Sequence, residues 1–308
     1  MLETIAIFIV SFFVLAKASE YVIDSSIDIT RIFGVSEFVT GFILLSVATS
    51  IPELFVCATA SMTGNGSIAI GNVIGANIAD IAWVLGATAL VGFVIFSKRR
   101  ATMNAAILFA ISLIPLVLIS KGTVTALDGI VLLLIFLIYC IFVSKVEFKG
   151  TKQPRRVTST LKAISIFLIS VAGVVFSAYL IVDSGVAIAS LLNVPPVFIG
   201  LSLISIGTTI PELSVNLTAV RKKKLSLAVG NILGSCVTNL TLVLGTAAVI
   251  NPIQIATVIP VSSIFFLIAL NLFLWARVRK GRLTRANGIT MIIAYILFMA
   301  FEAGIIGL

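Results

Sequence analysis

Two glutamates, Glu53 and Glu212, stand inside long apolar runs that contain no Lys or Arg to pair with them. A charged group in such a run costs about 2.5 to 3.5 kcal/mol on membrane-insertion scales, so its presence indicates a site that uses the charge. Each glutamate follows a proline, which lacks an N–H and interrupts the helical hydrogen-bond ladder, so nearby carbonyls are freed. Carboxylate and carbonyl oxygens suit hard cations such as Ca²⁺. The two Pro-Glu steps therefore predict cation ligation rather than a structural ion pair.

The two glutamates belong to one motif that occurs twice. Residues 41–86 align without a gap on residues 200–245, with 19 identities in 46 positions and a constant offset of 159 residues. The identities include Thr, Pro, Glu, Asn and Gly, which chance similarity between apolar segments would not keep in register. The chain is therefore an internal duplication.

Polar residues recur with helical spacing after each glutamate. At positions i, i+4 and i+8, the first copy has Asn72, Ala76 and Asp80, and the second copy has Asn231, Ser235 and Asn239. Residues with this spacing share one face of a helix, so we expect both faces to look toward the glutamates. Two alternatives stay open: the asparagines bond helix to helix, and Asp80 is a neutral hydrogen-bonding acid, because burial beside two carboxylates disfavours its charge.

The composition is that of an all-α polytopic membrane protein. Of 308 residues, 60% are hydrophobic and 11% charged, and the mean hydropathy is +1.24. About ten apolar runs have the roughly 20 residues that a transmembrane helix needs, whereas a β-barrel would show short alternating segments. These runs lie near residues 2–22, 36–62, 67–95, 102–120, 125–145, 161–184, 194–220, 225–249, 255–276 and 285–306.

The net charge of +9 reflects topology rather than nucleic-acid binding. The Lys and Arg residues gather in or beside the loops that follow odd-numbered spans, and only Lys121 falls on the other side. Basic loops face the cytoplasm, so both termini are predicted to be extracellular in a multi-pass protein of the cell membrane. No basic stretch is interleaved with aromatic residues as in nucleic-acid binders. The lipid bilayer is the partner implied, and no obligate protein partner is evident.

Topology and duplication together predict the architecture. The first repeat, 1–148, would hold five spans and begin outside. A charged cytoplasmic linker, 149–160, would lead to a second five-span repeat, 161–308, that begins inside. Two inverted repeats whose broken helices meet at the bilayer midplane are typical of secondary transporters.

Enzyme chemistry finds little support. The three cysteines are widely spaced in apolar segments, which is typical of buried free thiols, and histidine is absent. An intramembrane protease would need a second motif aspartate beside Asp80. An ion channel on the same site is another alternative, although duplicated broken helices favour alternating access.

The motifs resemble those of a known family. Thr-Ser-Ile-Pro-Glu at 49–53 and Thr-Thr-Ile-Pro-Glu at 208–212, each followed by Gly-Asn-x-x-Gly, are similar to the paired repeats of the calcium/cation antiporter superfamily, especially its prokaryotic sodium/calcium exchangers. The resemblance covers essentially the whole chain. It implies a Na⁺/Ca²⁺ antiporter that works by alternating access, with no resident cofactor.

The resemblance also implies a ligand set. Glu53 and Glu212 would be shared by calcium and sodium, and the backbone carbonyls of Thr49 and Thr208 would complete the calcium site. Asp80 and Asn239 would flank the centre. Sodium would be bound by carbonyls and hydroxyls that come from both copies, namely those of Ser46, Ser205, Ser50, Thr209 and Ser235.

Two departures from the family pattern bear on the driving ion. The acid and the amide of the central pair, Asp80 and Asn239, stand in the opposite order from the archaeal relatives, although the carboxylate count is kept. Ala76 occupies a position that usually carries Ser, so one sodium site lacks a hydroxyl. The alternative is an H⁺/Ca²⁺ or K⁺-dependent antiporter on the same site. The absence of histidine favours sodium.

Overall fold

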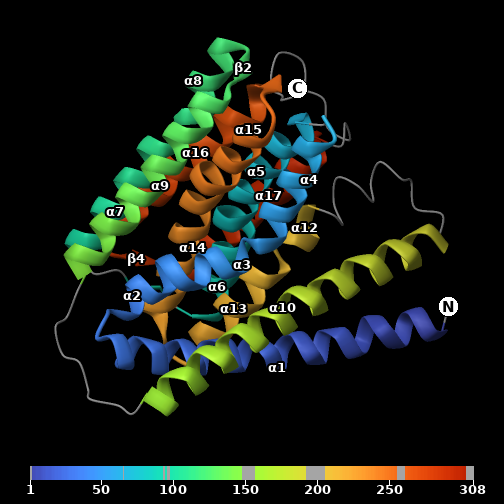
Figure 1. Cartoon of the computed structure of the whole chain (residues 1–308), viewed down its shortest axis with the longest axis vertical. Coiled ribbons are helices and arrows are strands. Elements are labelled where there is room, and N and C mark those ends of the chain that lie inside the picture. Colours follow the sequence, from blue (N-terminus) through green and yellow to red (C-terminus); the bar gives the residue numbers. More distant parts are fainter. Residues whose placement is uncertain are drawn as a thin grey trace.

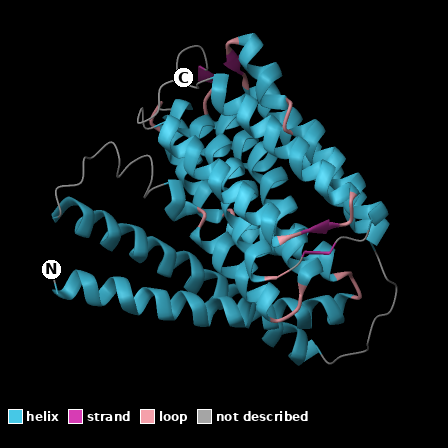
Figure 2. Ribbon diagram, turned by 180° about the vertical axis from the view of Figure 1, so that it is seen from behind, coloured by secondary structure: helices cyan, strands magenta, loops and turns pink. Residues whose placement is uncertain are grey.

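The computed structural model describes residues 2–64, 66–92, 94–95, 98–147, 157–191, 205–254 and 261–302. Helices dominate these residues (Figures 1 and 2). The predicted linker lies mostly outside the described residues, as does the start of the second motif, 200–204. In the first half the elements are α1 (Leu2–Phe33), α2 (Glu37–Val39), η1 (Thr40–Leu45), α3 (Ser46–Thr49), α4 (Ile51–Met62), α5 (Gly66–Ala79), η2 (Asp80–Val84), α6 (Leu85–Val91), β1 (Val94–Ile95), α7 (Lys98–Ile111), α8 (Ile114–Lys121), β2 (Thr123–Val124) and α9 (Ala126–Glu147).

The second half repeats these elements. It contains α10 (Val157–Leu191), α12 (Ser205–Thr208), α13 (Ile210–Arg221), α14 (Leu225–Thr238), η4 (Asn239–Val243), α15 (Leu244–Ile250), β3 (Ile253–Gln254), α16 (Val261–Arg279), β4 (Arg282–Leu283) and α17 (Arg285–Glu302). The bounds of α3 to α6 recur 159 residues later in α12 to α15, and η2 recurs as η4. The duplication seen in the sequence is therefore present in the secondary structure.

Seven helices among the described residues are long and apolar enough to cross a membrane, or eight when a bent pair is counted as one span. The bent pair joins Glu37–Thr49 to Ile51–Met62 at an angle of 45°. Many large apolar side chains on α1, α9 and α10 are exposed, as expected for surfaces that face lipid. The chain is thus a multi-pass helical membrane protein.

Two equivalent spans, Ile68–Val91 and Leu225–Ile250, form the centre of the bundle. In Ile68–Val91, 72% of the most apolar stretch is buried, and in Leu225–Ile250 the share is 83%, against 22% in Ala126–Lys145. The long helices α1 and α10 pack along each other and lie to one side of the remaining helices (Figures 1 and 2). The structure therefore consists of a central body and a separate two-helix layer.

Contacts between the halves come in matched pairs. β1 pairs antiparallel with β4, and β2 pairs antiparallel with β3. A Cβ added to Gly129 would meet the Gly245 carbonyl at 2.7 Å, and one added to Gly288 would meet the Gly86 carbonyl at 2.6 Å. The contacts correspond through the 159-residue offset. Adding 159 to Gly129 and subtracting 159 from Gly245 gives the Gly288–Gly86 contact, and the same operation turns the β1–β4 pair into the β3–β2 pair. The halves thus approach each other through equivalent surfaces.

Two predicted boundaries were wrong. The first span does not end near residue 22, because α1 continues to Phe33 and stops only before Gly34, whose φ of +68° favours glycine. The span predicted at 102–120 is divided into α7 and α8 by a turn at Ser112 and Leu113, just before Pro115, which lacks the N–H needed to continue the ladder.

Candidate cation site

The two Pro-Glu steps place the glutamates at equivalent helix starts. Glu53 lies in the first turn of α4 and Glu212 in the first turn of α13, each with proline at the preceding position. Both side chains are 1% exposed. A helix N-terminus carries partial positive charge, which favours a carboxylate there. The local sequence therefore buries two acids and orients each at the break of its helix.

Neither carboxylate is satisfied by hydrogen bonds within the described part of the chain. Among the described residues, no oxygen of Glu53 or Glu212 has a hydrogen-bond partner. The ion pairs of the described chain, such as Lys121–Asp128, involve other acids. Burying a charge without a partner costs several kcal/mol, so such a pair of acids persists only where something else neutralises it. The arrangement suits a cation held between them.

Each glutamate faces a threonine from the other half. The Thr208 hydroxyl lies beside the carboxylate of Glu53, and the Thr49 hydroxyl lies beside that of Glu212, both beyond strict hydrogen-bonding geometry. Glu212 also interacts electrostatically with Glu53 and Asp80. The three acids therefore share one region of the interior, and the breaks of both halves contribute to it.

A group of neutral oxygens lies next to these acids, where α3 meets α14. The Thr49 hydroxyl lies 3.5 Å from the carbonyl oxygen of Ser46, from Oδ1 of Asn231 and from the hydroxyl of Ser235. The Ser46 hydroxyl lies 3.4 Å from that of Thr238. All five side chains are at most 3% exposed.

The spacing of these oxygens is informative. Hydroxyl hydrogen bonds are typically about 2.7 to 2.8 Å long, so contacts of 3.4 to 3.5 Å are weak ones. Two ligands bound at about 2.4 Å to one cation, at right angles, are roughly 3.4 Å apart. These oxygens are thus only weakly bonded to one another, which leaves them available to a small hard cation.

The corresponding face of α5 is different. Asn72 is half-buried, and its amide nitrogen donates to the sulfur of Cys57 at 3.4 Å, one turn along α4 from Glu53. Ala76 and Ala79 stand where α14 has Ser235 and Thr238, so this face supplies no hydroxyl. The structure thus places the oxygens of Asn231 and Ser235 in the neutral group beside α3, whereas the Asn72 amide is directed at a thiol.

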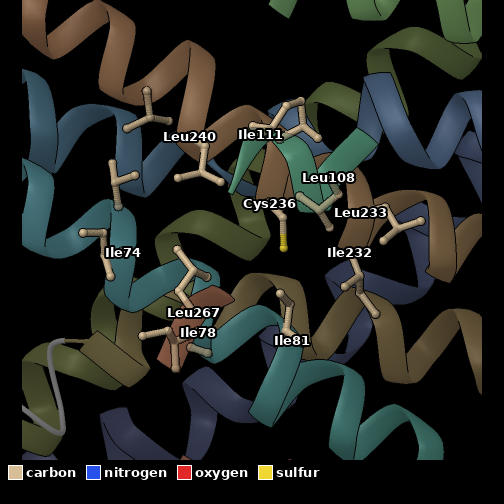
Figure 3. Close-up of a cluster of buried hydrophobic side chains, with 14 of the residues drawn as sticks. Ile74, Ile78, Ile81, Leu108, Ile111, Ile232, Leu233, Cys236, Leu240 and Leu267 are labelled. Carbon is tan, nitrogen blue, oxygen red and sulfur yellow. The ribbon is translucent and has the colours of Figure 1, made fainter. Parts of the chain in front are cut away.

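Asp80 and Asn239 begin the equivalent π-helices η2 and η4 and are each 1% exposed. π-helical turns occur often at functional sites. Oδ1 of each lacks a hydrogen-bond partner among the described residues. Oδ2 of Asp80 lies 4.0 Å from the sulfur of Cys236. Cys236 in turn lies within a cluster of buried aliphatic side chains (Figure 3).

The other predicted ligands are placed as follows. Ser50 is 1% exposed and its hydroxyl has no partner among the described residues, so it is available at the break before α4. Thr209 is also 1% exposed, and Thr208 is partly buried. Ser205 begins α12, but its side chain lies outside the described residues.

Acidic ligands alone do not make the site. No group of three His, Cys, Asp or Glu side chains in the described part of the chain is close enough to hold a metal ion. Any cation bound here must therefore complete its shell with hydroxyl, amide and carbonyl oxygens, which hard cations accept.

Sequence reasoning missed two buried polar residues. Thr238 contacts Ser46, and its spacing of seven from Asn231 puts it on the same helical face, which could have revealed it. Asn216 is fully buried, and its amide donates to the carbonyl of Glu212 at 2.7 Å, while Oδ1 lacks a partner among the described residues. It lies four residues after Glu212 but aligns with Cys57, so the duplication concealed it.

The fold is that of a multi-pass helical membrane protein whose centre offers buried oxygen ligands to a cation. The family model described as sodium/calcium exchanger protein matches residues 3–145 and 162–303, and the chain belongs to this family. It is therefore a cation/Ca²⁺ antiporter and not an enzyme, as the sequence predicted.

Individual relatives agree with this assignment. The chain is 27% identical to the sodium/calcium exchanger MaX1 of Methanosarcina acetivorans, covering 92% of this chain and 94% of the relative. It is 28% identical to the putative antiporter CaxA of Alkalimonas amylolytica, covering 93% of both. It superposes on the sodium–calcium exchanger NCX_Mj soaked with Na⁺ and Sr²⁺ with a TM-score of 0.87 at 27% identity, covering 96% of this chain and 97% of that one.

Proposed function

We propose that the chain exchanges Na⁺ for Ca²⁺ across the membrane by alternating access. The observation that carries the proposal is the pair of buried, unpartnered carboxylates of Glu53 and Glu212, each beside a threonine from the other half. A divalent ion between them would neutralise both charges at once. Ca²⁺ takes about six to eight oxygens, more than one broken helix can offer, so both halves are needed for one ion.

The remaining predicted ligands divide by chemistry. The carbonyls of Thr49 and Thr208 would complete the calcium shell. The neutral oxygens where α3 meets α14 suit a monovalent cation, because a neutral cage does not compensate a double charge. Na⁺ would be bound there by the Ser46 carbonyl with Thr49, Asn231 and Ser235, whose spacing supports a small cation.

Coupling follows from the cost of the empty site. When the site is empty, two buried negative charges oppose the movement that would carry them through a dry interior. One Ca²⁺ or more than one Na⁺ removes this charge and permits the movement. The protein would therefore cross between facing states loaded with either ion, which exchanges them.

The architecture proposed for this mechanism is two inverted five-span repeats, ten spans in total, with both termini outside. Three observations support it: the basic loops, the 159-residue recurrence of the elements, and contacts between the halves in matched pairs. The linker at 149–160 would then be cytoplasmic.

The competing proposal is that H⁺ drives calcium movement on the same site. Purified protein in proteoliposomes separates the two when ⁴⁵Ca²⁺ uptake is measured under an outward Na⁺, K⁺ or H⁺ gradient of equal size. We expect uptake under the Na⁺ gradient alone. Uptake that follows the H⁺ gradient and ignores Na⁺ would establish the alternative.

A further inference from the structure

The α1–α10 layer contacts the central body unequally. α1 packs against α13, the helix that carries Glu212, while no comparable packing of α10 on α4 occurs among the described residues. The buried hydroxyl of Ser19 on α1 forms a 2.7 Å hydrogen bond with that of Ser214 on α13. The two-helix layer is thus bonded to the second half two residues from a site glutamate.

An ion pair reinforces the same contact at the end of α13. Lys222, in the turn between α13 and α14, lies with its ammonium 2.6 Å from Oδ1 of Asp24 and 3.3 Å from the carbonyl of Glu20, both on α1. We call the pairs Lys222–Asp24 and Ser19–Ser214 the latch. It bonds one helix of the outer layer to the body.

The turn that carries Lys222 has an equivalent in the first half. The amide of Lys222 donates to the Thr218 carbonyl, and the amide of Thr63 donates to the Thr59 carbonyl 159 residues earlier. The next residues, Lys223 and Gly64, both have positive φ, of 59° and 78°. Thr63 is therefore the structural counterpart of Lys222.

The first half nevertheless lacks the chemistry of the latch. Thr63 replaces the lysine, although Asp183 keeps the aspartate of position 24 and is exposed on α10. The counterparts of Ser19 and Ser214 are Ala178 and Phe55, which cannot form a hydroxyl pair. The latch is thus present on one side only of a duplicated scaffold.

In a transporter built from inverted repeats, the two facing states are related by exchanging the roles of the halves. By this symmetry the contact of α1 with α13 in one state would be replaced in the other by a contact of α10 with α4. We propose that the latch, Lys222–Asp24 with Ser19–Ser214, stabilises the facing state seen here over the opposite one, because the opposite contact has neither bond. The proposal rests on the alternating-access function proposed above.

The latch is weak enough to be released during transport. The side chains of Lys222 and Asp24 are 30% and 59% exposed. Ion pairs this exposed contribute up to about 1 kcal/mol, so loss of the pair should change the ratio of the two states about two- to five-fold. A strong buried pair would instead hold the protein in one state.

A neighbouring ion pair provides a matched control. Lys224, two residues further along the same turn, pairs with Glu37 on α2 at 2.8 Å, with similar burial of the lysine. α2 packs on α14 within the central body. Breaking this pair removes the same kind of charge from the same turn but leaves the contact with α1 intact.

The test measures the distance between α10 and α4 by pulsed electron paramagnetic resonance on the full chain in lipid nanodiscs. Spin labels would replace the exposed residues Tyr179 and Met62, with Cys140 replaced by serine and the buried Cys57 and Cys236 kept. The latched state gives a long distance and the opposite state a short one. Transport by the labelled protein is assayed in parallel.

We expect Lys222→Met and Asp24→Asn to raise the short-distance population about two- to five-fold, and the exchange of both charges, Asp24→Lys with Lys222→Asp, to reverse the effect. Lys224→Met should leave it unchanged. Thr63→Lys should also raise the short-distance population, because the new lysine would meet Asp183 only in the opposite state.

Unchanged distances in Lys222→Met and Thr63→Lys, with the wild type transporting, would overturn the latch. Loss of exchange in the wild type would instead refute the proposed function.

Discussion

The α5 face and the α14 face descend from one duplicated segment, yet only one of them is rich in oxygens. α14 presents Asn231, Ser235 and Thr238 to α3, whereas α5 has alanine at the last two of these positions. The glutamates at the helix breaks, in contrast, are retained in both halves and equally buried. From this difference we expect that the charged centre needs both copies, while the neutral part of the site needs only one.

The largest expected effect is on the shared centre. Replacing Glu53 or Glu212 by Gln keeps the shape of the side chain and removes its charge. Each variant should reduce ⁴⁵Ca²⁺ exchange by at least about 100-fold, since it removes one of the two carboxylates that would pair with the divalent ion, and breaking a buried pair of opposite charges typically costs about 3 to 5 kcal/mol. Robust Na⁺-driven uptake by the variant carrying both substitutions would place the site elsewhere.

Helix packing gives a second contrast. A Cβ on Gly234 would clash with the Phe42 carbonyl and would meet the Ser46 side chain at 2.7 Å. We expect Gly234→Ala to lower the free energy of unfolding by about 1 to 3 kcal/mol, because overpacking forces backbone shifts. Gly71→Ala, at the exposed position of α5, should not destabilise the protein. Equal melting temperatures of the two variants in detergent would remove this contrast.

The neutral oxygens predict a smaller effect. Ser235→Ala should raise the Na⁺ concentration for half-maximal exchange about two- to ten-fold, the effect of losing one oxygen partner worth roughly 0.5 to 1.5 kcal/mol. The reciprocal change Ala76→Ser would add a hydroxyl to α5 and should leave this concentration unchanged or lower it. Titration of Ca²⁺ efflux with Na⁺ measures both. If Ser235→Ala behaves like the wild type, the α14 face is not a sodium site.

The smallest effect is expected at the flanking pair. Asp80→Asn should retain part of the calcium exchange, because Asp80 is the one acid of the three without a counterpart acid in the other half. Initial rates at saturating Ca²⁺ test this, with Asn239→Asp as the matched variant. Loss of exchange as complete as in Glu53→Gln would make Asp80 an essential ligand.

Much of the fold was accessible from the sequence, because its signals are local. Apolar runs predicted the helices, and Pro52 and Pro211 predicted breaks where the structure has them. Burial of Glu53, Glu212 and Asp80 followed from their apolar surroundings.

The long-range contacts were not accessible. Nothing in the sequence indicated that Lys222 would meet Asp24 across 198 residues. The duplication also misled, since equal positions need not have equal roles. Asn72 and Asn231 share a motif, but one contacts a thiol and the other the hydroxyl of Thr49. Such differences depend on packing between the halves.

Equilibrium Ca²⁺ binding to the purified protein tests the central claim most directly, namely that one cation site is assembled from both halves. Isothermal titration of the wild type, of Glu53→Gln and of Glu212→Gln, each with and without Na⁺, gives the number of sites and their competition. We predict one Ca²⁺ per chain, displaced by Na⁺ and lost in either single variant. Two sites in the wild type, with one retained in each variant, would show that the halves bind calcium independently and would contradict this account.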